Sequence, residues 1–160
     1  MSIDNLFGLP AHPLVVHAAV VLLPMAAIAT VVVAAVPRWR RPYALLAFVV
    51  SVVAAGAIWL AKESGESLES RVAETALVER HTELAEQVLP WAIAVVVVAG
   101  TVLVADRYRS RLAKIPTRAI TITLVVAAMI TGVGATWTVA EVGHSGAKAT
   151  WHDVAPSDGG

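Results

Sequence analysis

The chain has 160 residues, of which 58% are hydrophobic and only 15% are charged, and its formal net charge at pH 7 is zero. A water-soluble domain of this length does not need so much apolar sequence, and a zero net charge does not favour a nucleic-acid partner. The absence of cysteine excludes disulfides, thiolate metal sites, iron–sulfur clusters and covalent c-type haem attachment, but leaves histidine-ligated metal or haem open.

Four runs of mostly apolar residues follow one another along the chain, and each is long enough to cross a hydrocarbon core of about 30 Å. They predict membrane-spanning helices at about 14–36, 43–61, 88–105 and 119–142. The predicted fold is therefore all-α, an integral membrane four-helix bundle. We expect it to form a single domain over 1–154, followed by a disordered tail at 155–160.

Prolines and a glycine mark the ends of the first and fourth predicted helices. Pro13 suits the first turn of a helix, Pro24 predicts a kink within the first span, and Pro37 ends that span. Gly143 is typical of a stop after the fourth helix. The stretch before the first helix lacks Lys and Arg, and the apolar run is longer than a signal-peptide core. We therefore expect that run to remain as a membrane helix.

Basic residues concentrate in the first and third connections between the predicted helices. They are Arg38, Arg40, Arg41, Arg107, Arg109, Arg111, Lys114 and Arg118. The positive-inside rule places both connections in the cytoplasm. We therefore expect a multi-pass protein of the cell inner (plasma) membrane, with both termini and the glutamate-rich second connection on the non-cytoplasmic side.

Small residues recur at four-residue spacing in two of the spans, and we expect them to be the seams where helices approach closely in the lipid bilayer. They are Ala47, Ser51 and Ala55 in the second span, Ala128, Gly132, Thr136 and Ala140 in the fourth, and Gly100 as a narrow point in the third. No Lys, Arg, Asp or Glu lies deep inside a span, which counts against a proton pump or an ion-coupled transporter.

The second connection contains a short amphipathic pattern over 66–87, with glutamates on one side and apolar residues on the other. It predicts a surface helix between spans 2 and 3 that lies along the outer face of the membrane. His81 falls on the apolar side of this helix and should point at the bundle.

All five histidines lie on the predicted outer side: His12, His17, His81, His144 and His152. Because a bundle brings the outer ends of helices together, we expect His17, His81 and His144 to converge in one partly buried cofactor-binding site. Neutral imidazole is the usual axial ligand of b-type haem and the commonest metal ligand. A divalent metal would need further ligands, which His12, Glu63 and Glu66 could supply. The equally weighted alternative is that these histidines only hydrogen-bond helix ends and lipid headgroups.

The segment from Gly8 to His17, which reads GLPAHPLVVH, resembles the opening of a bacterial membrane family known as domain of unknown function 2231. The stretches Trp59 to Arg71, Glu79 to His81 and Gly143 to Ala147 are also similar to that family. Where family members often carry Phe-Pro after the second histidine, this chain has Ala18-Ala19. The resemblance implies a four-helix membrane domain without a defined activity. Related domains look like parts of proteins fused to cytochrome-like modules, which favours a redox role by association.

Three functional hypotheses follow. The first is a membrane protein that binds b-type haem or a metal for electron transfer to a redox partner, with His17 and His144 as leading axial ligands and His81 as the alternative partner. The second is a non-catalytic subunit or scaffold for a partner membrane protein. A membrane enzyme ranks last, because the sequence has no nucleophile motif and no phosphate-cradling glycine loop, and no residue is assigned a catalytic role.

Overall fold

The computed structural model describes residues 5–6, 9–69, 75–111 and 115–151. Its helices are α1 (Ala11–Ala35), α2 (Pro37–Glu69), α3 (Ala76–Glu86), α4 (Val88–Arg107) and α5 (Thr117–Trp151). They are preceded by a small antiparallel pair of strands, β1 (Asn5–Leu6) and β2 (Leu9–Pro10). The tail at 155–160, Lys114 and His152 lie outside the described residues.

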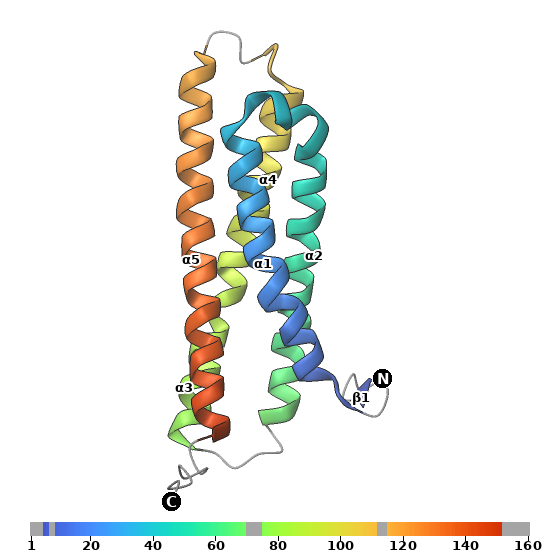
Figure 1. Ribbon diagram of the computed structural model, residues 1–160, viewed down its shortest axis with the longest axis vertical. Coiled ribbons are helices and arrows are strands. Elements are labelled where there is room, and N and C mark those ends of the chain that lie inside the picture. The colour runs from blue at the N-terminus through green and yellow to red at the C-terminus, as the bar shows by residue number, and fades with distance from the viewer. Residues whose placement is uncertain (1–4, 7–8, 70–74, 112–114, 152–160) are drawn as a thin grey trace, which may run out of the picture.

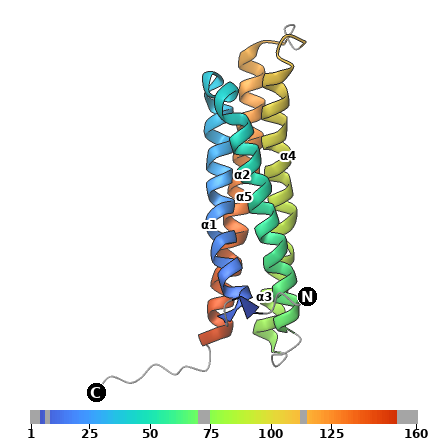
Figure 2. The same ribbon diagram turned by 90° about the vertical axis from the view of Figure 1, so that its right-hand side faces the viewer.

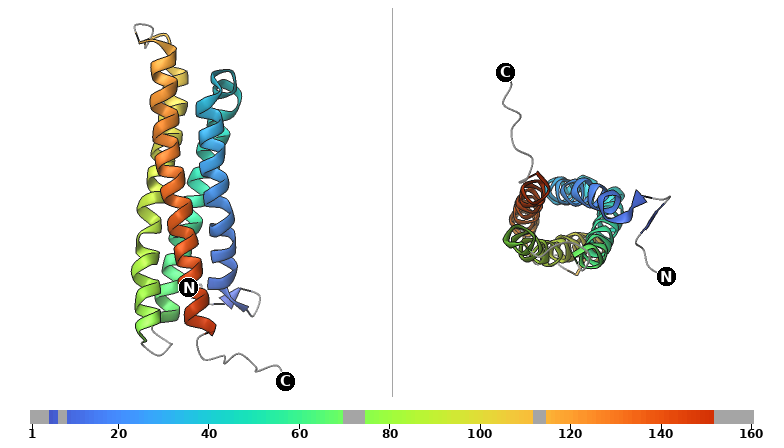
Figure 3. Two further views of the ribbon diagram at one scale, coloured as in Figure 1. Left: turned by 60° about the vertical axis from the view of Figure 1, so that its left-hand side comes forward. Right: turned by 90° about the horizontal axis from the view of Figure 1, so that it is seen from below.

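The helices form four parallel columns, and α3 and α4 share one of them (Figures 1 and 2). Seen along its axis the bundle is square, with α1 beside α2 and α5, and the α3–α4 column also beside α2 and α5 (Figure 3). The α3–α4 column therefore lies diagonally opposite α1. The predicted all-α bundle is confirmed.

Four helical stretches of the described chain are long and apolar enough to cross a membrane: His12–Ala35, Pro37–Glu69, Ala76–Arg107 and Thr117–Trp151. One end of the bundle carries the α1–α2 and α4–α5 connections, and we call it the arginine end. At the other, the histidine end, α1 begins, α2 ends, α3 begins and α5 ends (Figure 1). With α3 and α4 counted together as one stretch, the five helices give the four membrane spans that the sequence predicted.

Helix α5 does not stop at Gly143, as the sequence predicted, but continues to Trp151. A glycine inside a helix costs only about 1 kcal/mol, and the packing of α3 against α5 beyond this point compensates for that cost. At 1.5 Å per residue the 35 residues of α5 extend about 50 Å, well beyond the hydrocarbon thickness. Helix α5 is therefore longer than a membrane span requires.

The amphipathic helix between spans 2 and 3 is present, but its bounds and direction differ from the prediction. Residues 66–69 belong to α2, and α3 begins at Ala76, where the Thr75 hydroxyl caps it by accepting a 3.3 Å bond from the Val78 amide. Only Gln87 separates α3 from α4, and the two continue in one column (Figure 2). Leu84 is buried, so the apolar side of α3 is covered by the bundle and not by the membrane surface.

Buried positions follow an alternating spacing of three and four residues. In α2 they are Arg40, Ala44, Ala47, Ser51, Ala54 and Ile58. In α5 the spacing is also three or four residues, with the step of four repeated once, and joins Leu124, Ala128, Gly132, Ala135 and Val139. This is the packing pattern of a left-handed coiled coil. The predicted seams are right at Ala47, Ser51, Ala128 and Gly132. Thr136 and Ala140 are exposed, because a strict four-residue spacing rotates about 40° around the helix at every step.

The interior is made mainly of small side chains, whereas large apolar side chains face outward. Ala26, Ala54, Ala92 and Ala135 are fully buried. Among the large exposed residues are Ile28, Leu46, Val97, Ile130, Val133 and Trp137. Lipid solvates large apolar side chains as well as a protein core does, so helix association there depends on close approach of small residues. The bundle therefore has the surface of a membrane protein.

Arg40 fastens three helices together at the arginine end. Its Nη2 donates to the carbonyl of Ala34, near the end of α1, and to Thr121 Oγ1 on α5 at 2.8 Å. The side chain is 5% exposed, and its Nε has no partner among the described residues. Arg40 thus occupies a core position of α2 while satisfying an unpaired carbonyl of α1.

We expect the substitution Arg40→Ala to lower the free energy of unfolding by about 1.5 kcal/mol, because two charge-assisted hydrogen bonds are lost. Thermal unfolding in detergent measures this change. Arg41→Ala is the matched control, since Arg41 is exposed and carries the same charge. An equal loss in both variants would contradict the assigned role of Arg40.

Candidate functional site

Two histidine–serine pairs lie at the histidine end, each joining two helices. His12 Nδ1 on α1 lies 3.0 Å from Ser64 Oγ on α2. His81 Nδ1 on α3 lies 3.0 Å from Ser145 Oγ on α5. All four side chains are half-buried. One histidine–serine contact therefore joins α1 to α2, and a second contact of the same length joins α3 to α5.

The hydrogen bonds of the two serines assign the tautomer of the two histidines. Ser64 Oγ donates to the carbonyl of Ala61 at 3.0 Å, and Ser145 Oγ donates to the carbonyl of Val142 at 2.9 Å. A hydroxyl has one hydrogen, so when the serine donates it to this carbonyl, its oxygen accepts from the neighbouring Nδ1–H. In the neutral imidazole Nε2 is then unprotonated and keeps its lone pair. Both histidines thus present Nε2, the nitrogen free to bind a metal.

A glycine follows each serine and makes room for the imidazole. A Cβ at Gly65 would lie 3.1 Å from His12 Cε1, and a Cβ at Gly146 would lie 3.0 Å from His81 Cε1. Any larger residue would push the ring away from its serine. The motif is therefore a Ser-Gly pair on one helix that receives a histidine from its neighbour, and it occurs twice.

The two histidines belong to opposite corners of the bundle, since α1 and the α3–α4 column are diagonal neighbours (Figure 3). One histidine–serine contact thus joins α1 to α2, and another joins the α3–α4 column to α5. Four-helix bundles hold cofactors with side chains on facing helices.

The other predicted ligands take different positions. His17 is exposed, and its Nδ1 is 2.6 Å from the Pro13 carbonyl of its own helix. His144 is exposed on α5, one residue before Ser145. No hydrogen bond that the structure gives for the described residues joins His17, His81 and His144. Glu66 pairs with Lys62. Three or more His, Asp or Glu side chains do not gather into a metal-binding group anywhere in the described residues, Glu63 included.

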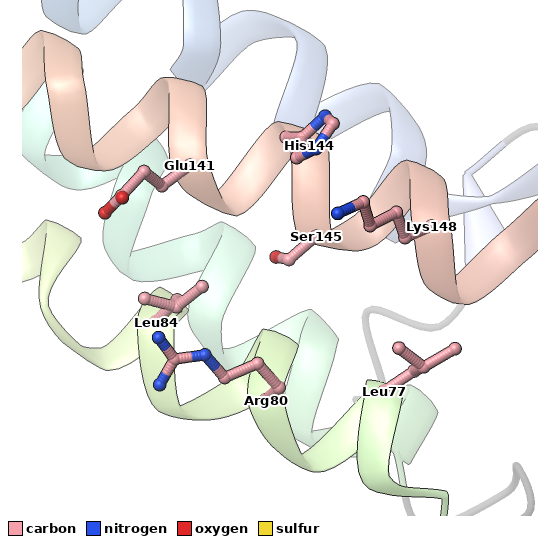
Figure 4. A pocket seen from close by; sticks show the side chains of 7 residues that line it. All are labelled: Leu77, Arg80, Leu84, Glu141, His144, Ser145 and Lys148. Atoms are coloured by element: carbon pink, nitrogen blue, oxygen red, sulfur yellow. The ribbon is translucent and has the colours of Figure 1, made fainter.

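A groove of about 270 Å³ runs between α3 and α5 beside the second histidine–serine pair (Figure 4). Its lining consists of Leu77, Arg80, Leu84, Glu141, His144, Ser145 and Lys148. Ser145 points from α5 toward α3, whereas the His144 ring turns away from α3 at the rim. The groove is thus an open depression with two cations and one acid, and it includes Ser145, the hydrogen-bond partner of His81.

Analysis of the sequence identified His12 and His81 but missed the serines that orient them. Ser64 and Ser145 lie 52 and 64 residues from their histidines, so no local spacing connects them. The sequence signal that could have identified them is the Ser-Gly dipeptide, which occurs near the end of α2 and again near the end of α5. Such a dipeptide is too short and too common to predict a site. Only the fold shows that each copy lies beside a histidine.

Comparison with known protein families gives one match. A family model described as "Predicted membrane protein (DUF2231)" matches residues 8–158, nearly the whole chain. Comparison with curated proteins gave no match, and comparison with solved structures gave none either.

Proposed function

The chain belongs to the family described as Predicted membrane protein (DUF2231), and on that premise we propose that it binds one b-type haem between His12 and His81 and transfers electrons. The observation that carries the proposal is the pair of histidine–serine hydrogen bonds, which leaves both Nε2 atoms unprotonated. His12 and His81 would be the two residues that hold the haem iron, and the haem would supply the electron-transfer chemistry.

The number of protein ligands favours haem over a bare metal ion. A structural zinc site needs four protein ligands and a catalytic site three, and the described residues contain no group of three or more His, Asp or Glu side chains that could hold a metal ion. Haem supplies four nitrogens of its own, so that two imidazoles complete the coordination. The absence of cysteine is compatible with a b-type haem, which has no covalent attachment.

Orientation follows from the distribution of basic residues. The arginine end carries most Lys and Arg of the short connections, and the positive-inside rule places it in the cytoplasm. The haem would then lie near the outer boundary of the plasma membrane, at the histidine end of the bundle. This position suits electron exchange with a redox partner at the outer surface.

Absorption spectroscopy tests the proposal. The full chain, expressed with ample haem and iron and purified in detergent, should show a sharp b-type α-band after reduction with dithionite, and about one haem per chain. Metal analysis of the same sample serves as the second measurement. A featureless spectrum without stoichiometric metal would reject the proposal and support the scaffold hypothesis.

A further inference from the structure

The groove between α3 and α5 brings two cations together from facing helices. Arg80 on α3 and Lys148 on α5 both line it, and Glu141 is the one acidic residue of its lining. Arg80 extends along α3 toward Leu84 (Figure 4). Lys148 extends along α5 toward Ser145, so both cationic side chains lean toward the membrane-spanning part of the bundle. The lining therefore has a net positive charge of one, at an end of the bundle that is otherwise rich in glutamate.

Neither cation is neutralised by the protein to any large extent. Arg80 Nη1 is 3.4 Å from Glu83 Oε2, but both side chains of this pair are exposed, and such pairs contribute little. Within the part of the chain that the structure describes, Lys148 makes no hydrogen bond or ion pair. Glu141 lies two turns before Lys148, about 10 Å along α5. Both cations are therefore available to an anion from outside the chain.

The height of the groove along α5 corresponds to the headgroup layer of a membrane. At 1.5 Å per residue, Glu141 and Lys148 lie about 35 and 45 Å along the helix from Arg118. A bilayer has a hydrocarbon core of about 30 Å and measures about 40–45 Å with its headgroups. Trp137, which is exposed on α5, lies about one turn before Glu141, and tryptophan is enriched where hydrocarbon meets headgroups. With Arg118 in the headgroup layer of the arginine end, the groove lies in the opposite headgroup layer.

The facing column gives the same height and adds apolar surface. Leu84 and Leu77 lie about 35 and 45 Å from Arg107 along α3 and α4. Both leucines line the groove, which is open and has a volume of about 270 Å³. A small water-soluble anion would leave this apolar wall in contact with water, whereas the glycerol backbone and acyl chains of a lipid would cover it.

We propose that this groove binds the phosphate of an anionic phospholipid of the phosphatidylglycerol type. Arg80 and Lys148 would each donate charge-assisted hydrogen bonds to the phosphate oxygens, as basic pockets between membrane helices do for lipid headgroups. A single negative charge on the lipid balances the net positive charge of the lining. The lipid would contact α3 and α5 together, and so reinforce the contact that the His81–Ser145 hydrogen bond makes between them. The proposal does not depend on haem.

Native mass spectrometry of the full chain in mild detergent tests the proposal by counting retained lipids. The protein is freed of lipid and then incubated with phosphatidylglycerol, or with phosphatidylethanolamine of the same acyl chains, which has the same phosphate but no net charge. We expect the double variant Arg80→Gln/Lys148→Gln to retain about one phosphatidylglycerol fewer per chain than the unmodified protein, and as much phosphatidylethanolamine. Because the variants are compared under identical conditions, lipid held by the arginine end cancels from this difference.

Two control variants separate a site in the groove from general charge. Lys62→Gln removes a cation from the same end of the bundle but outside the groove, where Lys62 pairs with Glu66, and should lose no lipid. Arg80→Lys/Lys148→Arg keeps both charges and should retain the lipid that the double glutamine variant loses.

Three results would overturn the proposal. Equal phosphatidylglycerol counts in the unmodified protein and the double glutamine variant would show that the groove holds no lipid. An equal loss of phosphatidylethanolamine would show that the groove does not select an anionic lipid. Displacement of the lipid by inorganic phosphate at the same concentration would show that the cations recognise free phosphate and that the apolar wall contributes nothing.

Discussion

Replacement of His12 or His81 by alanine is expected to abolish the absorption of bound haem, because each substitution would remove one of the two residues proposed to hold the haem. His12 is held by Ser64 and His81 by Ser145 in the same geometry, so the two variants should lose binding to the same extent. The measurement is the reduced absorption spectrum together with the haem content per chain. Both variants should remain folded, since the histidines are only half-buried.

The substitutions His17→Ala and His144→Ala are the matched controls. Both residues are exposed imidazoles near the same end of the bundle, and His17 bonds only to its own helix. Each variant should retain haem at the level of the unmodified protein. Loss of haem in these variants, with retention in the first pair, would restore the ligand set that the sequence alone had favoured.

The substitution Gly134→Val is expected to lower the free energy of unfolding by about 3 kcal/mol, the upper end of the range for overpacked cores. A Cβ at Gly134 on α5 would lie 2.6 Å from ring atoms of Trp91 on α4, well inside contact distance. The ring fills the space that the glycine leaves, and Trp91 is packed against the core cluster near the histidine end. Thermal unfolding in detergent measures the loss.

Gly143→Val provides the control for this prediction, because a Cβ at Gly143 meets no atom within 4 Å. It should be neutral or slightly stabilising, since valine has a better helix propensity than glycine. The double variant Gly134→Val/Trp91→Ala should lose less stability than the two single variants together, because the valine no longer meets the ring. If Gly134→Val unfolds at the same temperature as Gly143→Val, then α4 and α5 do not approach each other as closely as described.

Membrane class and helix number could be predicted from the sequence because they depend on local quantities. The length and hydropathy of each apolar run decide whether it can cross a bilayer, and neither depends on what it contacts. Helix ends were predicted less well. Gly143 and the residues after it look like a terminus by local preference, but contacts with α3 extend α5 to Trp151.

The sequence could not predict which face of each spanning helix is buried inside the bundle. In a soluble helix the apolar side identifies the core, but here lipid-facing positions such as Ile130 and Val133 are as apolar as the interior. Only contact with neighbouring helices distinguishes Ala135, which is buried, from Thr136, which is exposed.

For the candidate site, the sequence by itself determined that histidines gather at one end of a membrane bundle, because topology follows from apolar runs and basic loops. The tertiary structure alone decided which of them share an environment. Ser64 and Ser145 lie far from His12 and His81 in the chain, and orient them only because α2 and α5 run beside α1 and α3. A hydrogen bond needs its two atoms to lie about 3 Å apart in space, whatever their separation along the chain. The histidine–serine pairs could therefore be identified only from the tertiary structure.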